Sequence, residues 1–406
     1  MATVVPFCGI RPRSDLAAEV IAPPYDVLSE AEAREIVARK PRSFLRVTRP
    51  EVNLPDGVDA HSLAAYAEGR KQLDADLAAG TLTQDAEPCF YLYVQTWQGQ
   101  TQAGLMALCR TADYDAGLIK RHELTRPDKE QDRVDHINTM DAQTGLVFLT
   151  YRDTNNTVRA AMAEAATRKP DWVVTTDDGV THALIVIDGA LITVLREAFT
   201  AVEALYVADG HHRSAAASRV AAERDNAGSS GLFLAGIFPD REMRILAYNR
   251  VVTDLNGHTP AAFLEAVSAH FVVTPSSAPS PESRGLWRMY LDGTWYGLTA
   301  KPGVTPDDPV GSLDVAVLQD RILAPLLGIE NPRTDKRISF VGGIRGTEAL
   351  QRAVDAGKGV AFSLYATGID QLLAVADADM LMPPKSTWFE PKLRGGVLLH
   401  RLIDGA

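Results

Sequence analysis

The sequence has few cysteines and no long apolar segment. Its 406 residues include only three cysteines, Cys8, Cys89 and Cys109, which are odd in number and lack the spacing of a zinc site. The longest apolar stretch, residues 231–238, is far too short to cross a bilayer. Residues 1–12 lack the charged start and apolar core of a secretory signal. We therefore expect a soluble cytoplasmic protein with reduced thiols and no membrane partner.

Basic residues are in the minority, and several common catalytic signatures are missing. Lys and Arg number 41 against 52 Asp and Glu, so the net charge is −11 and non-specific binding to nucleic acid is disfavoured. The chain has no Gly-x-Ser-x-Gly elbow, no His-Glu-x-x-His, no dinucleotide fingerprint and no Walker Gly-Lys-Ser/Thr loop. These absences argue against the enzyme classes that those motifs define. The sequence does not indicate an oligomeric state.

The composition that remains is that of an ordinary globular protein, with 46% hydrophobic and 23% charged residues. The chain is too long for one typical core, so we expect two domains or one large elaborated domain. The Pro- and Ser-rich stretch 274–283 is a linker by composition. It predicts an α+β portion at 1–273 and a smaller mixed α/β portion at 284–406. Interspersed helices and paired strands favour the α+β class over a doubly wound parallel sheet.

Local patterns predict individual elements. Ser29 followed by acidic residues predicts a capped helix to Ala38, and alternation at 87–96 and 101–111 predicts two strands paired around a Gly-containing turn. Residues 4–25 are expected to be an extended connector. The other strands are expected at 43–48, 145–151, 171–176, 181–188, 232–238, 244–252 and 287–298 (a hairpin), and the helices at 61–79, 128–141, 157–167, 189–198 and from about 259.

The most informative stretch is Ala208-Asp209-Gly210-His211-His212-Arg213-Ser214, between an apolar run and an Ala-rich segment that ends near Ala222. This order predicts a strand, a sharp turn at Gly210 and a helix. The N-terminus of the helix, two imidazoles, a guanidinium and the Ser214 hydroxyl would suit a phosphate. Asp209 would repel that anion unless it binds a metal or takes a proton, so its presence suggests chemistry. The alternative is that Asp209 only caps the helix.

A second cluster, Lys120 to Lys129, is polar and locally basic. A solvated surface is one explanation for it. Because Pro127 interrupts regular structure there, Arg121, Glu123 and Arg126 are instead expected near a loop, where a carboxylate between cations can serve as a general base.

Two further clusters are candidates for a ligand-binding wall. Lys336 and Arg337 precede a Gly-rich segment, where turn formation is the simpler explanation. Lys385 and Trp388 lie in a Pro-rich loop that would either cover the core or face a ligand.

Five motifs together resemble the bacterial and archaeal family called domain of unknown function 1015. The resemblance covers essentially the whole chain, and its motifs are Ala22–Asp26, Arg121–Pro127, Ala208–Arg213, Asp335–Arg337 with Gly342-Gly343, and Pro383–Pro391. The turn from Asp209 to Arg213 is also similar to the phosphate-binding turn of the ParB/sulfiredoxin-like superfold, and particularly to that of free-serine kinases. The resemblance implies a ParB/sulfiredoxin-like core with large insertions.

The resemblance further implies a small-molecule kinase with ATP or ADP as phosphate donor, Mg²⁺, and free serine or a related compound as acceptor. Arg213, His211 and the start of the helix would then hold phosphate, and His212 would orient a phosphate oxygen. Asp209 or Glu123 would accept the hydroxyl proton or hold Mg²⁺. No glutamate matches the catalytic glutamate of those kinases by motif; Glu123 is the candidate from its surroundings, followed by Glu30 and Glu51.

Two alternatives to a kinase remain open at this point. One is a ParB-like nucleotide-binding switch without turnover, which the basic cluster at 120–129 favours and the acidic net charge disfavours. The other is a phosphatase that acts on a phosphorylated small molecule, because the same site would suit the related reaction.

Overall fold

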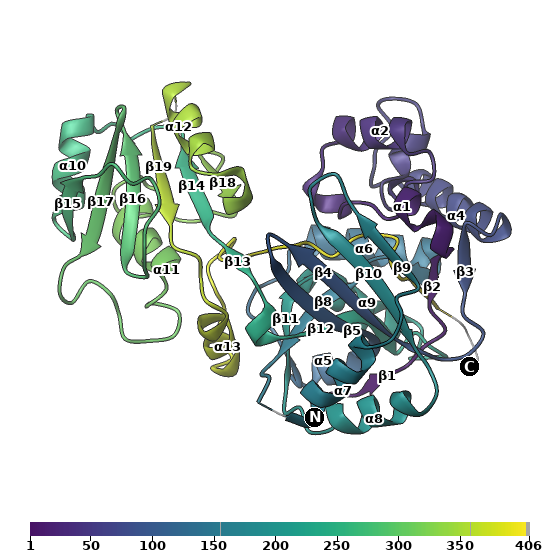
Figure 1. Ribbon diagram of the computed structural model, residues 1–406. Coiled ribbons are helices and arrows are strands. Elements are labelled where there is room, and N and C mark those ends of the chain that lie inside the picture. Colours follow the sequence, from purple (N-terminus) through teal and green to yellow (C-terminus); the bar gives the residue numbers. More distant parts are fainter. Residues whose placement is uncertain (155, 358, 403–406) are drawn as a thin grey trace. The chain divides into compact units, whose positions relative to one another are not determined.

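The structure is a computed structural model that describes residues 1–154, 156–357 and 359–402. The chain forms two compact units (Figure 1). The first unit consists of residues 1–243 together with the segment from residue 391 onward, and the second unit is residues 244–390. The second unit is therefore an insertion in the sequence of the first. Both units combine helices with mainly antiparallel sheets, which confirms the α+β class.

The first unit is built on a large mixed sheet. Among the described residues, nine strands form it in the order β6-β11-β8-β12-β5-β4-β10-β9, with β1 paired to β5. The strands of this unit are β1 (Val4–Val5), β2 (Ile10–Pro12), β3 (Leu82–Gln84), β4 (Phe90–Trp97), β5 (Gln100–Arg110), β6 (Ile119–Lys120), β7 (Ala142–Gln143), β8 (Val147–Tyr151), β9 (Trp172–Thr175), β10 (Thr181–Ile187), β11 (Leu205–Asp209), β12 (Leu232–Pro239) and β21 (His400–Arg401). The predicted hairpin of β4 and β5 turns at Gln98 and Gly99, both with positive φ.

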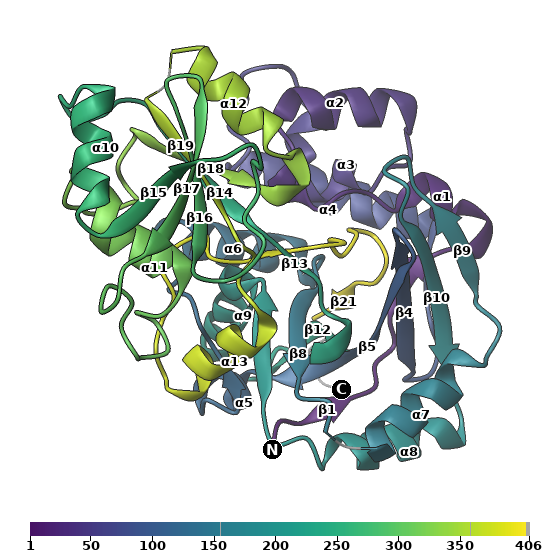
Figure 2. The same cartoon turned by 60° about the vertical axis from the view of Figure 1, so that its left-hand side comes forward.

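Helices pack on this sheet and on one another. The α-helices are α1 (Ala17–Val20), α2 (Glu30–Arg39), α3 (Leu45–Thr48), α4 (Leu63–Ala78), α5 (Thr111–Asp115), α6 (Pro127–Met140), α7 (Asn156–Ala166), α8 (Ala190–Phe199) and α9 (His211–Glu223). Short 3-10 helices are η1 (Ser14–Leu16), η2 (Tyr25–Val27), η3 (Pro50–Asn53) and η4 (Asp240–Glu242). Apolar side chains of α7 and α8 join the main core. Helix α9 packs against β8 and β12 and on its other side against α6 (Figure 2).

The second unit has its own antiparallel sheet, in the order β15-β17-β16-β19-β14-β18. Its strands are β13 (Ile245–Leu246), β14 (Tyr248–Val252), β15 (Phe271–Pro275), β16 (Leu286–Leu291), β17 (Thr294–Ala300), β18 (Ile338–Gly342), β19 (Val360–Leu364) and β20 (Trp388–Phe389). Its helices are α10 (Pro260–Ser268), α11 (Asp314–Leu318), α12 (Glu348–Asp355), α13 (Ile369–Asp377), the short π-helix η5 (Gln319–Leu323) and the 3-10 helix η6 (Gly343–Arg345).

The predicted domain boundary is corrected by this division. The segment 274–283 is not a linker between domains, because it connects β15 to β16 inside the second unit. Its first residues belong to β15, which pairs with β17, and Ser276 continues that pairing with a hydrogen bond to the Trp295 carbonyl. A Pro- and Ser-rich composition marks a turn between strands as well as it marks a linker.

Two local predictions are also corrected. Residues 43–48 were expected to be a strand, but α3 occupies Leu45–Thr48, because this places Phe44, Leu45 and Val47 in one buried cluster. Packing overrides the β-propensity of Val47 and Thr48 there. The opening segment 4–25 is not only an extended connector, since it contributes two short strands and α1. No helix in the described part of the chain combines the length and apolar character needed to cross a bilayer.

Candidate functional site

The site lies in the first unit, where two neighbouring strands end. Strand β11 pairs in parallel with β6, with Leu205 opposite Ile119 and Tyr206 opposite Lys120. Parallel strands finish at the same edge of a sheet. The pairing therefore brings the two polar clusters at 121–126 and 209–213 together, although they are far apart in sequence.

The turn between β11 and α9 has the shape that its sequence predicts. Gly210 has φ +100°, in the left-handed region that favours glycine. A Cβ on Gly210 would also come within 3.0 Å of Arg213 Nε. Gly210 itself occupies the N-cap position of α9, and no side chain supplies a cap hydrogen bond. Asp209 is therefore not the helix cap, which removes the simplest structural explanation for its presence.

Asp209 is held by two cations. Lys392 Nζ donates to Asp209 Oδ2 at 2.9 Å, and Arg213 Nη2 lies 3.8 Å from Oδ1. Burial opposes ionisation of this carboxyl, but the charges of Lys392 and Arg213 outweigh it and hold the pKa of Asp209 well below its usual value. The side chain keeps 33% of its surface exposed. Asp209 is thus an ionised carboxylate that a ligand can still reach.

Arg213 connects the turn to the loop before β8. Its Nη1 donates to the Leu146 carbonyl at 2.5 Å, and its side chain packs against Gly145, where a Cβ would lie 3.4 Å from Arg213 Cδ. The guanidinium is therefore positioned from two sides. Its remaining N–H groups are directed by these contacts toward Asp209 and the adjoining cavity.

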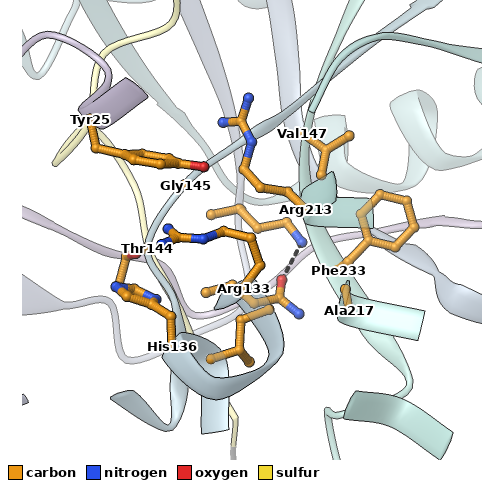
Figure 3. A pocket seen from close by; sticks show the side chains of 12 residues that line it. Tyr25, Arg133, His136, Thr144, Gly145, Val147, Arg213, Ala217 and Phe233 are labelled. Carbon is orange, nitrogen blue, oxygen red and sulfur yellow. Dashed lines mark hydrogen bonds between the residues drawn. The ribbon is translucent and has the colours of Figure 1, made fainter. Parts of the chain in front are cut away.

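A small cavity of about 30 Å³ with a mixed lining adjoins the turn (Figure 3). Its polar lining includes Arg213, Arg133 and His136 of α6, and Tyr25, whose hydroxyl points toward the Arg213 side chain (Figure 3). The Arg133 guanidinium lies 4.5 Å from the centre of the Tyr25 ring and is almost fully buried. Arg133 is ion-paired with the neighbouring Asp132 at 2.6 Å, so Arg213 is the guanidinium that most favours an anionic ligand at this cavity.

A larger cavity of about 230 Å³ lies elsewhere in the first unit, between Ile21, Ile36, Asp177 and Arg394. Arg394 is ion-paired there with Asp178. None of the predicted site residues appears among the described residues that line it.

Two buried imidazoles meet beside the turn. The His122 and His211 rings are 4.5 Å apart, centre to centre, and nearly perpendicular. His122 Nδ1 and His211 Nε2 have no hydrogen-bond partner in the part of the chain that the structure describes. Burial lowers the pKa of His122 to about 4, and burial followed by the charge of His122 lowers the pKa of His211 well below its usual value. Both rings are neutral near pH 7.

Glu123 lies next to this pair. One of its carboxylate oxygens, one nitrogen of His122 and one nitrogen of His211 all fall within 4.8 Å of one another. Glu123 is partly exposed, while both histidines are buried. The predicted grouping of Glu123 with the turn is thus present in the structure.

Two residues of the predicted phosphate site have other contacts. His212 Nε2 accepts a hydrogen bond from the Arg126 backbone N–H at 3.0 Å, so it ties the turn to the 121–126 loop. Ser214 is fully buried, and its hydroxyl donates to the His211 carbonyl at 3.0 Å. Short side chains near a helix start often bond backbone groups in this way. We therefore assign positioning and structural roles to His212 and Ser214.

The remaining candidates of the first unit lie at the edge of the site. The Arg121 guanidinium stacks 5.1 Å from the Tyr114 ring centre, and Arg126 pairs with Asp128 at 2.8 Å. The two reserve glutamates for the base, Glu30 and Glu51, form ion pairs with arginines outside the site, Glu30 with Arg34 and Glu51 with Arg49.

The expected ligand wall belongs to the second unit. Arg337 pairs with Asp335 at 2.9 Å and donates to the Leu327 and Gly328 carbonyls. Lys385 Nζ lies 5.8 Å from the Tyr248 ring centre, and Trp388 Nε1 donates to Glu390 at 2.8 Å. The ligand-binding role of Lys336, Arg337, Lys385 and Trp388 stays a prediction.

Sequence reasoning missed several residues of the site. Lys392 follows Asp209 by 183 residues, and only its place at the end of the Pro-rich motif could have singled it out. Tyr25 and His122 lie inside motifs that the resemblance uses but were not assigned to the site. Arg133 and His136 are spaced one helical turn apart on α6, within a run of charged residues. In such a run, the sequence alone does not distinguish a helix face that contacts a ligand from one that contacts solvent.

Comparisons with known proteins place the chain in a family. The sequence matches the family described as "Protein of unknown function (DUF1015)" over residues 4–316, and the protein belongs to this family. A comparison with curated proteins gives no match.

Several solved structures are similar to this one. A free serine kinase variant in complex with ADP has 10% sequence identity and a TM-score of 0.36, over 70% of this chain and 87% of that one. A conserved hypothetical protein from Pyrococcus furiosus has 11% identity and a TM-score of 0.34, over 70% and 90%. SbnI with a C-terminal truncation, from Staphylococcus aureus, has 10% identity and a TM-score of 0.41, over 73% and 87%.

Proposed function

We propose that the protein is a small-molecule kinase that transfers a phosphoryl group from ATP or ADP to a hydroxyl, with free serine or a related hydroxy compound as the first candidate acceptor. The observation that carries the proposal is the ionised Asp209 at the start of α9, paired with Lys392 and flanked by Arg213. Phosphoryl transfer depends mainly on positioning and charge neutralisation, and this turn supplies both.

The phosphate-binding groups are those that converge on the turn. The first turn of a helix has N–H groups without intrahelical acceptors and the positive end of the helix dipole, and Gly210 allows close approach of the backbone. Arg213 adds a guanidinium group at the adjoining cavity, and Arg133, which is paired with Asp132, lines the same cavity. A cavity of about 30 Å³ is far too small for a nucleoside. We therefore assign it to one small anionic group, and the rest of the nucleotide extends outside it.

The reaction then needs one carboxylate. The acceptor hydroxyl donates a hydrogen bond to Asp209, its oxygen forms a bond to the terminal phosphorus, and the bond from that phosphorus to the bridging oxygen of the nucleotide breaks. Asp209 takes the hydroxyl proton as the new bond forms. A carboxylate of low pKa suffices for this role, because in a loose phosphoryl-transfer transition state the proton leaves late. Lys392 and Arg213 keep Asp209 ionised and available.

Asp209 is poorly suited to hold Mg²⁺. Mg²⁺ prefers carboxylate oxygens that are not already neutralised, and Lys392 donates to Asp209 at 2.9 Å while Arg213 lies nearby. We therefore derive no step through a metal on Asp209, and any Mg²⁺ that the reaction uses enters with the nucleotide.

The test is a direct search for product. Purified full-length protein is incubated with labelled ATP, ADP or pyrophosphate, Mg²⁺ and a panel of hydroxy amino acids, and phosphorylated products are separated and identified. We expect transfer to one hydroxy compound. No product from any donor over a range of pH would contradict the proposal. Release of phosphate from phosphoserine alone would indicate a phosphatase, and nucleotide binding without turnover but with tight DNA binding at physiological salt would indicate a switch.

A further inference from the structure

Two buried histidines and a glutamate carboxylate lie close together beside the turn, and phosphate binding does not explain this grouping. His122 and His211 are 2% and 6% exposed, and each has one ring nitrogen with no hydrogen-bond partner among the described residues. Unsatisfied buried nitrogens are costly and are rare in native proteins. Here two such histidines are neighbours, and one nitrogen of each ring and one Glu123 oxygen lie within 4.8 Å of one another.

From this convergence we propose that His122, His211 and Glu123 bind one divalent transition-metal ion, such as Zn²⁺, Mn²⁺, Co²⁺ or Fe²⁺. Two imidazoles and one carboxylate are a common ligand set for such ions, and three protein ligands leave positions open for water or an anionic oxygen. The site is distinct from a Mg²⁺ site on Asp209, and it does not depend on the proposed phosphotransfer.

The hydrogen bonding of His122 prepares it for this role. The backbone of Val207 bonds its imidazole, while Nδ1 is the nitrogen without a partner. A histidine that ligates a metal commonly donates its other N–H to a backbone carbonyl, which fixes the tautomer and the ring orientation. Val207 lies on β11, so the strand that carries the turn also orients this ligand.

The distances require a small closure when the ion binds. Ligand atoms about 2.1 Å from one ion are no more than about 4.2 Å apart, slightly less than the 4.8 Å limit found here. Glu123 lies in the irregular segment between β6 and α6, where backbone adjustment is easiest. His211 lies at the first position of α9, also an adjustable place in a helix.

The choice of metal follows from the ligands. Mg²⁺ takes oxygen ligands and retains water, so a site with two nitrogens disfavours it. Imidazole nitrogen suits the first-row transition metals and zinc. We therefore expect a large excess of Mg²⁺ to leave a bound transition metal in place.

The experiment measures metal binding by the full chain without nucleotide. Metal-free protein, prepared with a chelator that is then removed, is titrated with Co²⁺ and followed by visible absorption, and with Zn²⁺ by calorimetry. We expect one ion per chain and nitrogen-ligand absorption bands for Co²⁺. His211→Gln and Glu123→Gln should each weaken binding by more than about a hundredfold, since even changes behind the ligands cost about 10- to 100-fold.

His400→Gln is the matched control. His400 is another buried histidine whose Nε2 has no partner in the described chain, and it does not belong to the His122 group. The His400→Gln variant should bind Co²⁺ as the unchanged protein does. If circular dichroism shows that His211→Gln does not fold, the partly exposed Glu123→Gln decides. The proposal is overturned if the unchanged protein binds no ion, if the two ligand variants bind normally, or if His400→Gln loses the ion equally. Since the titration contains no nucleotide, a failure to bind metal would contradict only the metal-site proposal, and a failure of the kinase assay would contradict only the proposed function.

Discussion

The Asp209 carboxylate forms no helix cap and pairs with a lysine that is distant in the sequence. Lys392 reaches it from the C-terminal segment and Arg213 from its own helix. The geometry keeps the charge in place and leaves about a third of the side chain accessible. A residue that only ended a strand would need neither cation.

Asp209→Asn tests the role of that charge. We expect turnover to fall by about 10²- to 10⁴-fold, the usual contribution of a proton acceptor, while nucleotide affinity persists or rises because repulsion of phosphate is removed. Steady-state kinetics with calorimetric nucleotide binding measures both. Unchanged turnover would show that the carboxylate has no part in the reaction.

Asp209→Asn should also change how the stability of the fold depends on pH. The folded state depresses the pKa of Asp209, so its ionisation stabilises the fold at pH values above the ordinary carboxyl range, and this stabilisation is lost as pH falls through the folded pKa. Asp209→Asn should therefore be less stable than the unchanged protein near neutral pH, and the difference should shrink in acid. Asp15→Asn is the control, because the Asp15–Arg13 pair is exposed on both sides and such pairs contribute little. Urea unfolding at several pH values gives the comparison.

Arg213→Ala should weaken nucleotide binding. Loss of one charge-assisted contact to phosphate costs about 2 kcal/mol, or about thirtyfold in Kd. The variant also leaves the Leu146 carbonyl without this donor, so a modest loss of melting temperature is expected. Arg219→Ala is the control on the same helix, because Arg219 pairs with Glu130 on α6. Equal affinity loss in both variants would mean that only the charge of α9 matters.

At the scale of elements, the turn before α9 depends on a backbone conformation. Gly210 has φ +100°, and any Cβ there meets the Arg213 guanidinium. The conformation and the arginine position are therefore coupled: one cannot change without disturbing the other.

Gly210→Ala separates backbone strain from displacement of Arg213. Placing a Cβ in the left-handed region costs about 1–2 kcal/mol. Gly357→Ala is a close control, since Gly357 has φ +99° and, among the described residues, no non-adjacent atom lies within 4 Å of its added Cβ. We expect both variants to lose similar stability in thermal or chemical unfolding, and only Gly210→Ala to lose nucleotide affinity. Normal affinity in Gly210→Ala would show that Arg213 can move without consequence.

Elements with strong local signals were predictable from the sequence. Ser29 and Glu32 form the capping box of α2, Thr259 caps α10, and the Asp292-Gly293 pair turns between β16 and β17 with positive φ at both residues. The strand–turn–helix at Gly210 was predictable for the same reason. Residues 43–48 were not, because burial of Phe44 and its neighbours, not propensity, decides their structure.

Longer-range features of the site could not be predicted from local patterns. The meeting of residues 121–126 with the turn depends on the pairing of β6 with β11, and the Lys392 contact on the return of the chain to the first unit. The prediction of the domain boundary was wrong for a related reason. A Pro- and Ser-rich composition does not indicate that one unit is inserted in the sequence of another. The ParB/sulfiredoxin-like character of the core stays a prediction.

At the scale of the whole molecule, several histidines are buried without charge. Burial lowers the pKa of His136 and His182 to about 3 and that of His400 to about 4, from an ordinary value of 6.5. The unfolded chain therefore binds protons in this range that the folded protein does not, and stability falls as pH decreases from 6.5 toward about 4.

This acid sensitivity can be measured directly. The denaturant midpoint of the full chain, taken at steps between these pH values, should fall continuously, and His400→Gln should reduce the slope because one proton-binding group is removed. A flat profile over this window would mean that the histidines protonate without unfolding.

The inserted second unit has a consequence for the order in which the site is synthesised on the ribosome. A ribosome completes Asp209, Gly210 and Arg213 long before it reaches Lys392, because residues 244–390 are made in between. Throughout that interval the nascent turn has its carboxylate but not the lysine that pairs with it. The segment from residue 391 onward, which also supplies β21 to pair with β7, is the last part of the first unit to be made. A message cut short within the insertion would thus yield a chain with every residue of the central motif and without the Asp209–Lys392 pair, so translation must pass residue 392 before the site is assembled.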